Sequence, residues 1–546
     1  MLGLAYASSP WFLAGLIKYK LSDWDLIVTR IRVGYPGWHG LRLHQLGVST
    51  TVGTQHFSLQ LYDTDIEYHI ADVLAGNLEH IHVPVATGRL QSAPATAPAA
   101  GTISALPLAA MVSGQWLSQI PVHEVQVDQL TIEGRTPSDA TYTVELNGKL
   151  GDAGLQVHAN LKLPEPKQEK FVISFNAYKT GEVSLSIVPS GTAEPIFNWA
   201  VNTVAIEQDQ SRANGMLHAK LQALAPVLGL WFTGKDWLAA LEGEFNCQWQ
   251  AVVAATGDIK LTLKQIQGTG SIWDINGEVN LFASRGSGQE LSILLQLIKL
   301  KGRYKKTVVD GLGAEVALVI GDGLHTTKSA ELNIELLHVG LPIENIALRF
   351  QLEQHPKTRE PVARVNKFAA ELLGGRVYAK PFKLDFGKEK NRFMVQLDGV
   401  GLNNIMQLEQ QAELQGSGVL DGQIPVDITR NGIQVAQGKL SARAPGGKIR
   451  YVPTQTVFTL AQTNPGVKLV VDALTDFQYH KLDVVADYKQ EGNLLLRVSL
   501  EGKNPNWQSG RPVNLNLNLE ENIPALLRSL QLSGEITERV RKHYQD

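Results

Sequence analysis

Residues 416–451 read GSGVLDGQIPVDITRNGIQVAQGKLSARAPGGKIRY, and this stretch decides the fold class. Its apolar side chains recur at or near every second position, which is the spacing of β-strands that bury one face. They are Val419, Ile424, Val426, Ile428, Ile433, Val435 and Leu440. Glycines separate the apolar runs, and we expect the backbone to reverse at Gly422, Gly432, Gly438 and Gly446–Gly447. The stretch therefore predicts consecutive strands with one apolar face.

The same alternation continues along most of the chain. Short strands are expected at Phe57–Leu61 and at Ile66–Ile70, and the last strand alternates leucine or valine with asparagine. Glycine-rich turns are expected at Gly311–Gly313 and Gly416–Gly418. The apolar residues that alternation places on strand faces are Leu155, Val157, Leu161, Phe171, Ile173, Phe175, Leu332, Ile334, Leu336, Ile346, Leu348, Phe350, Val395, Leu397, Val513, Leu515, Leu517 and Leu519.

Helices are expected only in a few places. Short ones are predicted at Trp237–Leu241 and Leu402–Leu408, and amphipathic helices are predicted after Glu520. The terminal helices rest on the spacing of Ile523, Leu526, Leu527, Leu530, Ile536 and Val540. With a turn every 8–12 residues, the chain would hold on the order of 45 strands.

Composition narrows the function classes. Apolar residues make up 44% and charged residues 19% of the 546 residues, which is ordinary for a folded chain, and 50 glycines favour a turn-rich β structure. The net charge of -3 argues against nucleic-acid binding, which requires a basic stripe. Cys247 is the single cysteine, so the chain contains neither an internal disulfide nor a multi-cysteine metal site.

The N-terminal residues Leu2–Ile17 are uncharged and mostly apolar. They fall just short of the roughly 20 residues that a membrane-spanning helix needs, and Lys18 and Lys20 follow rather than precede them. Residues 1–17 therefore fit the remnant of a membrane anchor, or an interfacial or capping helix. Further on, residues 92–114 begin with a proline- and alanine-rich segment that indicates a linker or loop.

The apolar strand faces must be covered, because burial of one Leu or Val contributes roughly 1.5–3 kcal/mol. A second sheet, packed helices or a curled sheet with a groove could cover them. The scarcity of amphipathic helices disfavours the second arrangement. The sequence periodicity is the same for two packed sheets and for one curled sheet with a groove, so both arrangements stay open.

Several motifs resemble the YdbH family of AsmA-like envelope proteins. They are GSGVLDGQIPV (416–426), GKLSARAPGGKIRY (438–451), ALTDFQY (473–479), LEGKNP (500–505) and PVNLNLNLEEN (512–522). The resemblance is strong from about Leu372 to the end and weaker at Gln115–Leu130. The order and spacing of the motifs support the resemblance, because each motif alone is short.

The resemblance implies a mainly β fold, an elongated, curled, antiparallel-rich sheet with an apolar concave groove. It implies phospholipid transport between the inner and outer membranes of a Gram-negative envelope, with lipid tails in contact with the apolar residues given above. It also implies an N-terminal inner-membrane anchor, a periplasmic body, and a small outer-membrane lipoprotein that docks at Val513–Asp546. Sliding of lipid needs neither enzymatic chemistry nor a cofactor.

The expected organisation has five parts. They are a possible anchor remnant at 1–17, N-terminal β repeats at 18–91, the linker or loop at 92–114, a central β region at 115–371, and a C-terminal YdbH-type domain with terminal helices at 372–546.

Other candidate sites are weaker. His80 and His82 share a strand face, with His39 and His44 upstream, but no ligand set has metal-site spacing, so no metal is predicted. The basic residues Arg443, Lys448 and Arg450 could hold an anion such as a phosphate head group, although a solvated sheet rim is the simpler interpretation.

Two alternatives to lipid transport remain. The first is a component that binds or transports a small solute such as a dicarboxylate, which would need a pocket with convergent arginines. The second is a structural envelope protein.

Overall fold

The structure is a computed structural model, and it confirms the predicted mainly β fold. It describes residues 2–22, 26–52, 55–74, 77–92, 117, 120–135, 141–164, 169–207, 210–228, 242–254, 256–285, 290–321, 323–355, 359–408, 414–429 and 432–530. The chain divides into two compact units, Met1–Ser271 (unit 1) and Ile272–Asp546 (unit 2). The predicted helix at Trp237–Leu241 and the segment after Leu530 lie outside the described residues, as does nearly all of the predicted linker.

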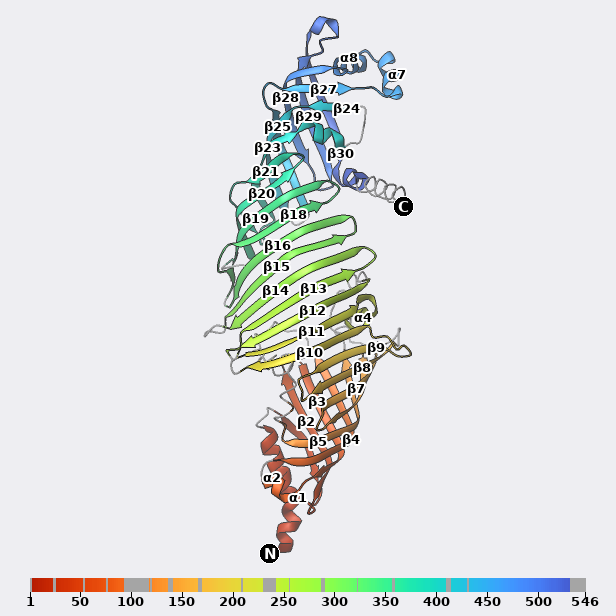
Figure 1. Cartoon of the computed structure of the whole chain (residues 1–546), viewed down its shortest axis with the longest axis vertical. Coiled ribbons are helices and arrows are strands. Elements are labelled where there is room, and N and C mark those ends of the chain that lie inside the picture. Colours follow the sequence, from red (N-terminus) through yellow and green to blue (C-terminus); the bar gives the residue numbers. More distant parts are fainter. Residues whose placement is uncertain are drawn as a thin grey trace. The chain divides into compact units, whose positions relative to one another are not determined.

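The described residues of unit 1 form strands β1 to β13 and helices α1, α2 and α4 (Figure 1). In chain order its elements are α1 (Leu2–Ser22), β1 (Ile27–Val33), β2 (Gly40–Val52), β3 (Gln55–Glu67), α2 (Ile70–Leu74), β4 (Leu78–Ser92), β5 (Val122–Arg135), β6 (Thr141–Leu150), β7 (Gly154–Lys162), β8 (Lys170–Tyr178), β9 (Val183–Pro189), β10 (Phe197–Glu207), β11 (Gln210–Lys220), α4 (Leu221–Leu228), β12 (Glu244–Ala254) and β13 (Ile259–Thr269).

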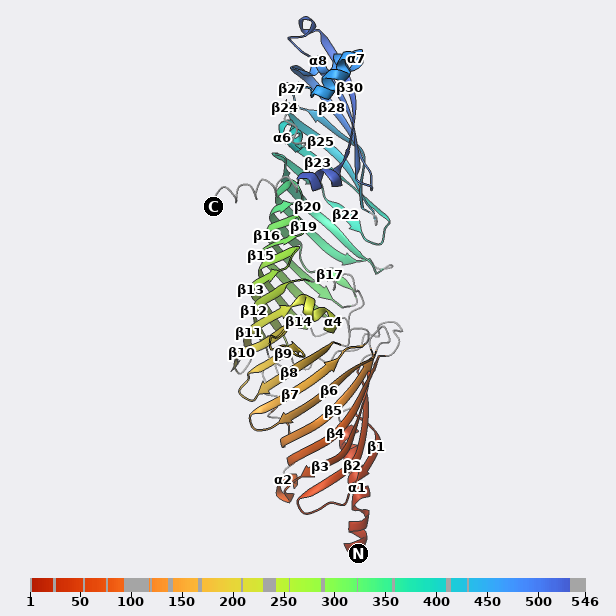
Figure 2. The same ribbon diagram turned by 90° about the vertical axis from the view of Figure 1, so that its right-hand side faces the viewer.

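Unit 2 consists of strands β14 to β30 with short helices near its C-terminal strands (Figure 2). Its elements are β14 (Trp273–Arg285), β15 (Leu291–Tyr304), β16 (Thr307–Ile320), β17 (Leu324–Thr326), β18 (Ala330–His338), β19 (Pro342–Gln354), β20 (Pro361–Leu372), β21 (Gly375–Ala379), β22 (Phe382–Asp385), β23 (Lys390–Gly401), α6 (Leu402–Leu408), β24 (Leu414–Ser417), β25 (Val419–Thr429), β26 (Gly432–Ala442), β27 (Gly447–Tyr451), α7 (Gln455–Thr463), α8 (Pro465–Leu474), β28 (Phe477–Tyr488), β29 (Asn493–Lys503), η2 (Gln508–Gly510) and β30 (Pro512–Asn522).

Neighbouring strands in each unit pair mostly in chain order and antiparallel. The exception among the described pairs is β4 with β5, which is parallel. A parallel pair needs a crossover of a dozen or more residues, and the chain between Ser92 and Val122 provides that length. The described residues form 30 strands rather than about 45, because many strands are long, up to the 15 residues of β4.

Helix α6 begins where the sequence predicted it, and a further helix follows Asn522. The Asn522 side-chain oxygen accepts a hydrogen bond from the Ala525 N–H (3.0 Å), which caps the start of that helix. The predicted stripe of Ile523, Leu526, Leu527 and Leu530 is partly buried, as an amphipathic helix requires.

Two of the predicted reversals are wrong. Gly422 and Gly438 lie inside β25 and β26. A Cβ at Gly422 would lie 2.9 Å from the Lys439 carbonyl oxygen and 3.1 Å from Leu440 Cγ, so glycine there relieves crowding within the sheet.

Two other local expectations also fail. Gly311–Gly313 lies within β16 rather than in a turn, and Gly311 has a φ of +66°, which marks an irregularity in the strand. The strand expected at Ile66–Ile70 is divided, because Ile66 belongs to β3 and Ile70 begins α2.

The motifs that carry the resemblance meet around Tyr479. Its hydroxyl donates to the Ser417 carbonyl oxygen (2.8 Å), and its side chain is buried, which raises the pKa of the phenol. A Cβ at Gly418 would lie 2.0 Å, and one at Gly447 2.7 Å, from the Tyr479 hydroxyl. These glycines therefore let two turns approach one buried tyrosine.

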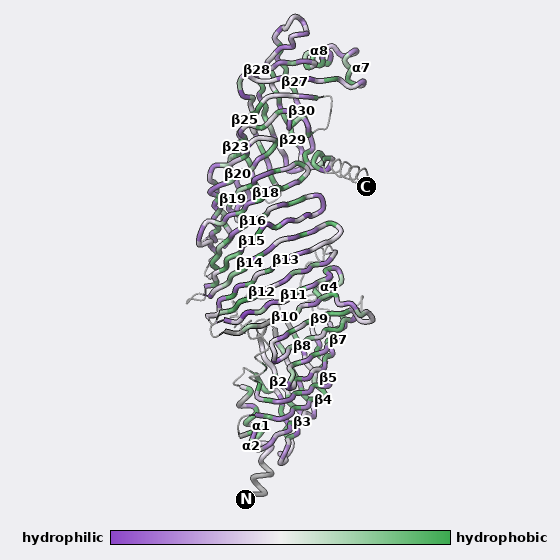
Figure 3. Tube along the Cα trace, in the orientation of Figure 1, coloured by the Kyte–Doolittle hydropathy of each residue, from purple (hydrophilic) through white to green (hydrophobic). Residues whose placement is uncertain are grey.

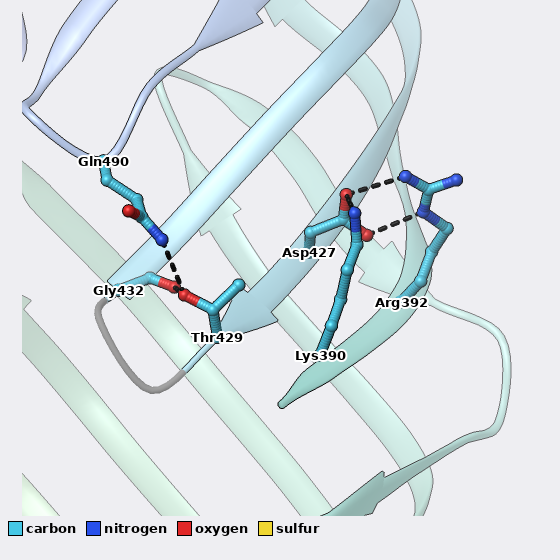
Figure 4. A network of polar contacts seen from close by, with 6 residues as sticks. All are labelled: Lys390, Arg392, Asp427, Thr429, Gly432 and Gln490. Atoms are coloured by element: carbon cyan, nitrogen blue, oxygen red, sulfur yellow. Dashed lines mark hydrogen bonds and ion pairs between the residues drawn. The ribbon is translucent and has the colours of Figure 1, made fainter. Parts of the chain in front are cut away.

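Asp427 joins β23 to β25 on the polar face of unit 2 (Figure 4). Arg392 donates to both carboxylate oxygens (2.6 and 2.7 Å), and Lys390 lies 2.8 Å from one of them. The hydrogen bonds from Arg392 hold the pKa of Asp427 at about 2, below its ordinary 3.8. Nearby, Gln490 donates to Thr429 (2.8 Å), which links the β28–β29 turn to the end of β25.

We expect Asp427→Asn to lower the free energy of unfolding by about 2 kcal/mol, because charge-assisted hydrogen bonds are lost. A carboxyl whose pKa is lowered on folding stabilises fully above its unfolded pKa and loses that contribution as the pH falls through its folded pKa. The stability gap between wild type and Asp427→Asn should therefore narrow from about pH 4 to pH 2. Urea unfolding measures it, with the exposed Asp152→Asn as control; a gap that is constant with pH would contradict the assignment.

Candidate lipid-binding face

Directly paired residues of unit 2 form an uninterrupted apolar row from β14 to β25. Residues opposite one another in antiparallel strands have their side chains on the same face of the sheet. The row therefore lies on one face, which we call the apolar face. It consists of Val279, Leu297, Ala314, Leu332, Leu348, Phe368, Ala379, Val395 and Ile424.

A second row continues the apolar face to the last strand. It starts beside the first, because Leu397 and Val395 are two residues apart on β23. Its members are Leu397, Gly422, Leu440, Val484, Val498 and Leu517.

The opposite face of the same strands is polar. Arg349 donates to Glu331 (2.6 Å) and Gln296 to Glu315 (2.9 Å), both across neighbouring strands. Figure 3 shows hydrophobic and hydrophilic residues mixed along the strands, as this alternation requires. The directly paired polar row is Asn280, Gln296, Glu315, Glu331, Arg349 and Lys367.

Unit 1 has an apolar row of the same kind, from β1 to β12. The parallel β4–β5 pair does not interrupt it, because Ala86 and Leu130 are directly paired. The row consists of Ile31, Leu46, Leu61, Ala86, Leu130, Leu146, Ala159, Ile173, Ile187, Phe197, Ala219 and Phe245.

The apolar face of unit 1 is partly covered by other parts of the chain. Leu161 and Phe171 are only 2% and 3% exposed, and they pack in one core with Leu224 and Val227 of α4. Leu155 and Phe175 pack against a second core that contains Leu117. Val157, which pairs with Phe175, is partly buried.

The residues of the first apolar row on β14 to β19 are half-buried. This also holds for the candidates on β18 and β19, namely Leu332, Ile334, Leu336, Ile346, Leu348 and Phe350. Leu336 differs from the others, because its direct partners are Asp310 and Glu344. The rest keep apolar area that a ligand with hydrocarbon chains could cover.

At the C-terminal end the apolar face is again covered. Leu515 is buried in a core with Ala473 of α8 and Leu402 of α6, and Val513 and Leu517 pack against it. Leu519 is half-exposed. The candidates Val395 and Leu397 on β23 are partly buried.

Asn504 holds α8 in place on the sheet. In the sequence it is noticeable only as part of the LEGKNP motif (500–505). Its side chain is 1% exposed and donates to the carbonyl oxygens of Asp472 (3.0 Å) and Ala473 (3.3 Å) and to the Thr475 hydroxyl (3.0 Å). It therefore satisfies carbonyl groups that a helix leaves without partners at its C-terminal end.

The three basic candidates do not converge on one site. Arg443 donates to Asp421 (2.6 Å) and to Asp398, contacts that raise its pKa and lower that of Asp421. Lys448 and Arg450 are exposed on β27. A cleft of about 690 Å³ beside Arg443 also contains Glu344, Glu371 and Asp398, so carboxylates surround its arginines.

The histidine candidates pair with carboxylates. His82 lies 2.7 Å from Asp128, His80 lies 3.9 Å from Glu124, and His44 lies 3.4 Å from Asp63. Within the described ranges, no three residues of metal-ligating type are grouped as an ion would require. His39 lies against the ring of His69, with 5.7 Å between the ring centroids.

Residues 283–545 match the family model described as YdbH-like, intermembrane phospholipid transport protein YdbH. This part of the chain is a YdbH-like domain. The description of that family names intermembrane phospholipid transport. No curated protein and no solved structure matches the chain.

The YdbH-like match begins within β14 and covers nearly all of unit 2. The predicted domain boundary between residues 371 and 372 falls within β20, one residue before that strand ends. It stays a prediction. At the other end of the chain, α1 is longer than the predicted anchor remnant of residues 1–17. Among the described helices, none has the length and apolarity needed to cross a bilayer.

We expect p-benzoylphenylalanine in place of Leu332 to photocrosslink to phospholipid, because that side chain lies on the apolar face. The same group at Asn333, the next residue on β18, lies on the opposite face and should give at most background. Mass spectrometry of the adducts measures both. Equal crosslinking from the two positions would show that lipid does not distinguish the faces.

We expect Asn504→Ala to lower the free energy of unfolding by about 1–3 kcal/mol, because buried carbonyl groups lose their donor. Asn506, whose amide donates to Asp476 (3.2 Å) near the surface, provides the control. Asn506→Ala should cost less than about 1 kcal/mol in the same urea titration. Equal losses would argue against the capping role of Asn504.

Proposed function

We propose that the chain carries phospholipids between the inner and outer membranes of a Gram-negative envelope, with their acyl chains against the apolar face. The observation that carries this proposal is the uninterrupted apolar row of unit 2, which lies within the YdbH-like domain from Leu297 onward. Its half-buried leucines on β18 and β19 supply apolar area that lipid tails can cover.

The free energy of acyl-chain exposure explains why such a surface promotes transfer. Each methylene group in water costs about 0.8 kcal/mol, so one long chain costs more than ~10 kcal/mol. A continuous apolar row reduces this cost at every strand, while the head group stays in water. In this mechanism the lipid slides without a covalent step, so we propose that the protein acts without enzymatic chemistry or a cofactor.

We further propose that the N-terminal end contacts the inner membrane. One side of α1 packs on unit 1 through Ile17 and Leu21, while Trp11, Phe12 and Tyr19 are exposed. An exposed aromatic helix surface that ends with lysines suits a membrane interface. The body of the protein would then lie in the periplasm.

The other end of the chain offers an edge for a protein partner. Among the described strands, β30 pairs with β29 alone, so its second edge is available for another strand. We propose that a small outer-membrane lipoprotein docks at Val513–Asp546, and β30 is the described part of that region. The solute-binding alternative has less support, because Arg443 already binds two aspartates.

We expect Leu348→Glu to reduce the phospholipid that copurifies with the protein by about tenfold, because a carboxylate in the apolar row is costly to desolvate. The same variant should slow transfer of a fluorescent phospholipid between vesicles. Leu348 suits this test better than Leu517, which packs against the C-terminal core and whose substitution would also disturb folding.

The matched control is Gln351→Glu, which places the same charge on the exposed polar face of β19, opposite Arg364. It should load lipid and transfer it like the wild type. Wild-type protein without phospholipid, or a fully active Leu348→Glu, would refute the proposal and favour a purely structural role.

A further inference from the structure

Helices α7 and α8 form a hairpin between β27 and β28 that stands out from the strands of unit 2 (Figure 1). The Thr454 side chain accepts a hydrogen bond from the Val457 N–H at the start of α7 (3.4 Å). Asn464 accepts from the N–H groups of Gly466 (3.0 Å) and Val467 (3.2 Å) at the start of α8, where Pro465 follows. Both helices are therefore capped by their own sequence.

The inner side of the hairpin is anchored to the sheet. Ala461, Val471 and Ala473 are buried, and Ala473 belongs to the core that contains Leu515 of β30. Asn504, the residue that follows β29, caps the C-terminal end of α8. The hairpin is thus a defined part of the fold.

The outer side of the hairpin exposes apolar side chains between uncharged polar residues such as Thr459 and Gln462. Val452 is 52%, Phe458 49%, Leu460 51% and Leu469 44% exposed. Lys468 is the single charged residue between Val452 and Val471. A helix pair on a protein surface normally directs charged side chains outward, so these exposed apolar side chains are candidates for contact with a partner.

We propose that the α7–α8 hairpin inserts its outer side into the head-group region of a lipid bilayer. Exposed aromatic and aliphatic side chains beside one lysine suit the boundary between acyl chains and anionic head groups, and Asp472, the acidic residue of α8, lies between the buried Val471 and Ala473. A protein interface would surround its apolar centre with a polar rim that includes charged residues, whereas Lys468 is the one charged residue between Val452 and Val471.

The position of the hairpin favours lipid as well. Its inner side shares a core with β28–β30, the last strands of the apolar face, so a bilayer on its outer side would lie next to the end of the lipid path. This inference rests on the proposed function and adds the membrane-contacting element to it. The site that loads lipid and the site that docks on the bilayer consist of different residues, so each can be tested alone.

The test uses the full chain with Cys247→Ala, which removes the buried native thiol, and Leu460→Cys labelled with an NBD dye. Vesicles of phosphatidylethanolamine and phosphatidylglycerol at 3:1 are added. We expect a blue shift and an intensity increase of about twofold, because the dye moves from water into the interface. A label at Glu491→Cys, exposed in the turn at the far end of β28, should not respond.

A local dye is needed because α1 could hold the whole protein on vesicles. An unlabelled pair of variants completes the test, each in a chain that also carries Trp11→Ser and Phe12→Ser to weaken the contact of α1 with vesicles. Phe458→Ser with Leu460→Ser should weaken vesicle binding about tenfold in co-flotation, whereas Phe386→Ser removes an aromatic ring of similar exposure on the β22–β23 turn and should leave binding unchanged. Equal thermal unfolding temperatures show that each variant is folded.

The outcomes separate this inference from the proposed function. A hairpin variant that still copurifies with phospholipid but loses vesicle binding supports the inference, as does a Leu348→Glu protein that loses its lipid and keeps the dye response. Absence of the dye response at position 460, or an equal response at position 491, overturns membrane insertion even if lipid still copurifies.

Discussion

Cross-strand register is the constraint on which the rest of this structure depends. A strand has its side chains on alternate faces, so a slip by one residue would exchange the apolar face with the polar face. In unit 2 the pairs Leu332–Leu348 and Glu331–Arg349 hold the register together: the first pair is apolar and the second is an ion pair on the opposite side. Exposed pairs such as Glu331–Arg349 therefore contribute specificity of alignment more than net stability, because exposed ion pairs contribute little.

Irregularities in the ladders do not break the apolar face. Register shifts occur in β23–β25 after Leu397 and in β25–β26 after Gln423, and one apolar row gives way to the next around them. Gly422 shows how this is achieved, because a side chain there would crowd Leu440. Glycine in the middle of a strand reduces local stability, but here it keeps neighbouring leucines on the same face.

The extent to which helices cover the apolar face varies along the chain. Covered parts of the face form hydrophobic cores, whereas uncovered parts remain available to a ligand. Helix α4 closes part of unit 1, and α6 and α8 close the C-terminal strands of unit 2. The strands between Trp273 and Gln354 keep half-buried leucines. Lipid tails need such an uncovered surface, whereas the covered ends provide the cores that hold the sheet together.

The sequence alone determined that the protein is built of strands with one apolar face, because period-two alternation is local and survives any arrangement of the strands. It also placed α6, the terminal stripe from Ile523 to Leu530, and the motifs of the YdbH-like domain. Only the tertiary structure decided which apolar residues are covered, that Asn504 caps α8, and that Arg443 is occupied by aspartates. Those facts depend on segments far apart in the chain, as Asn504 and Asp472 are, and no local pattern encodes such contacts.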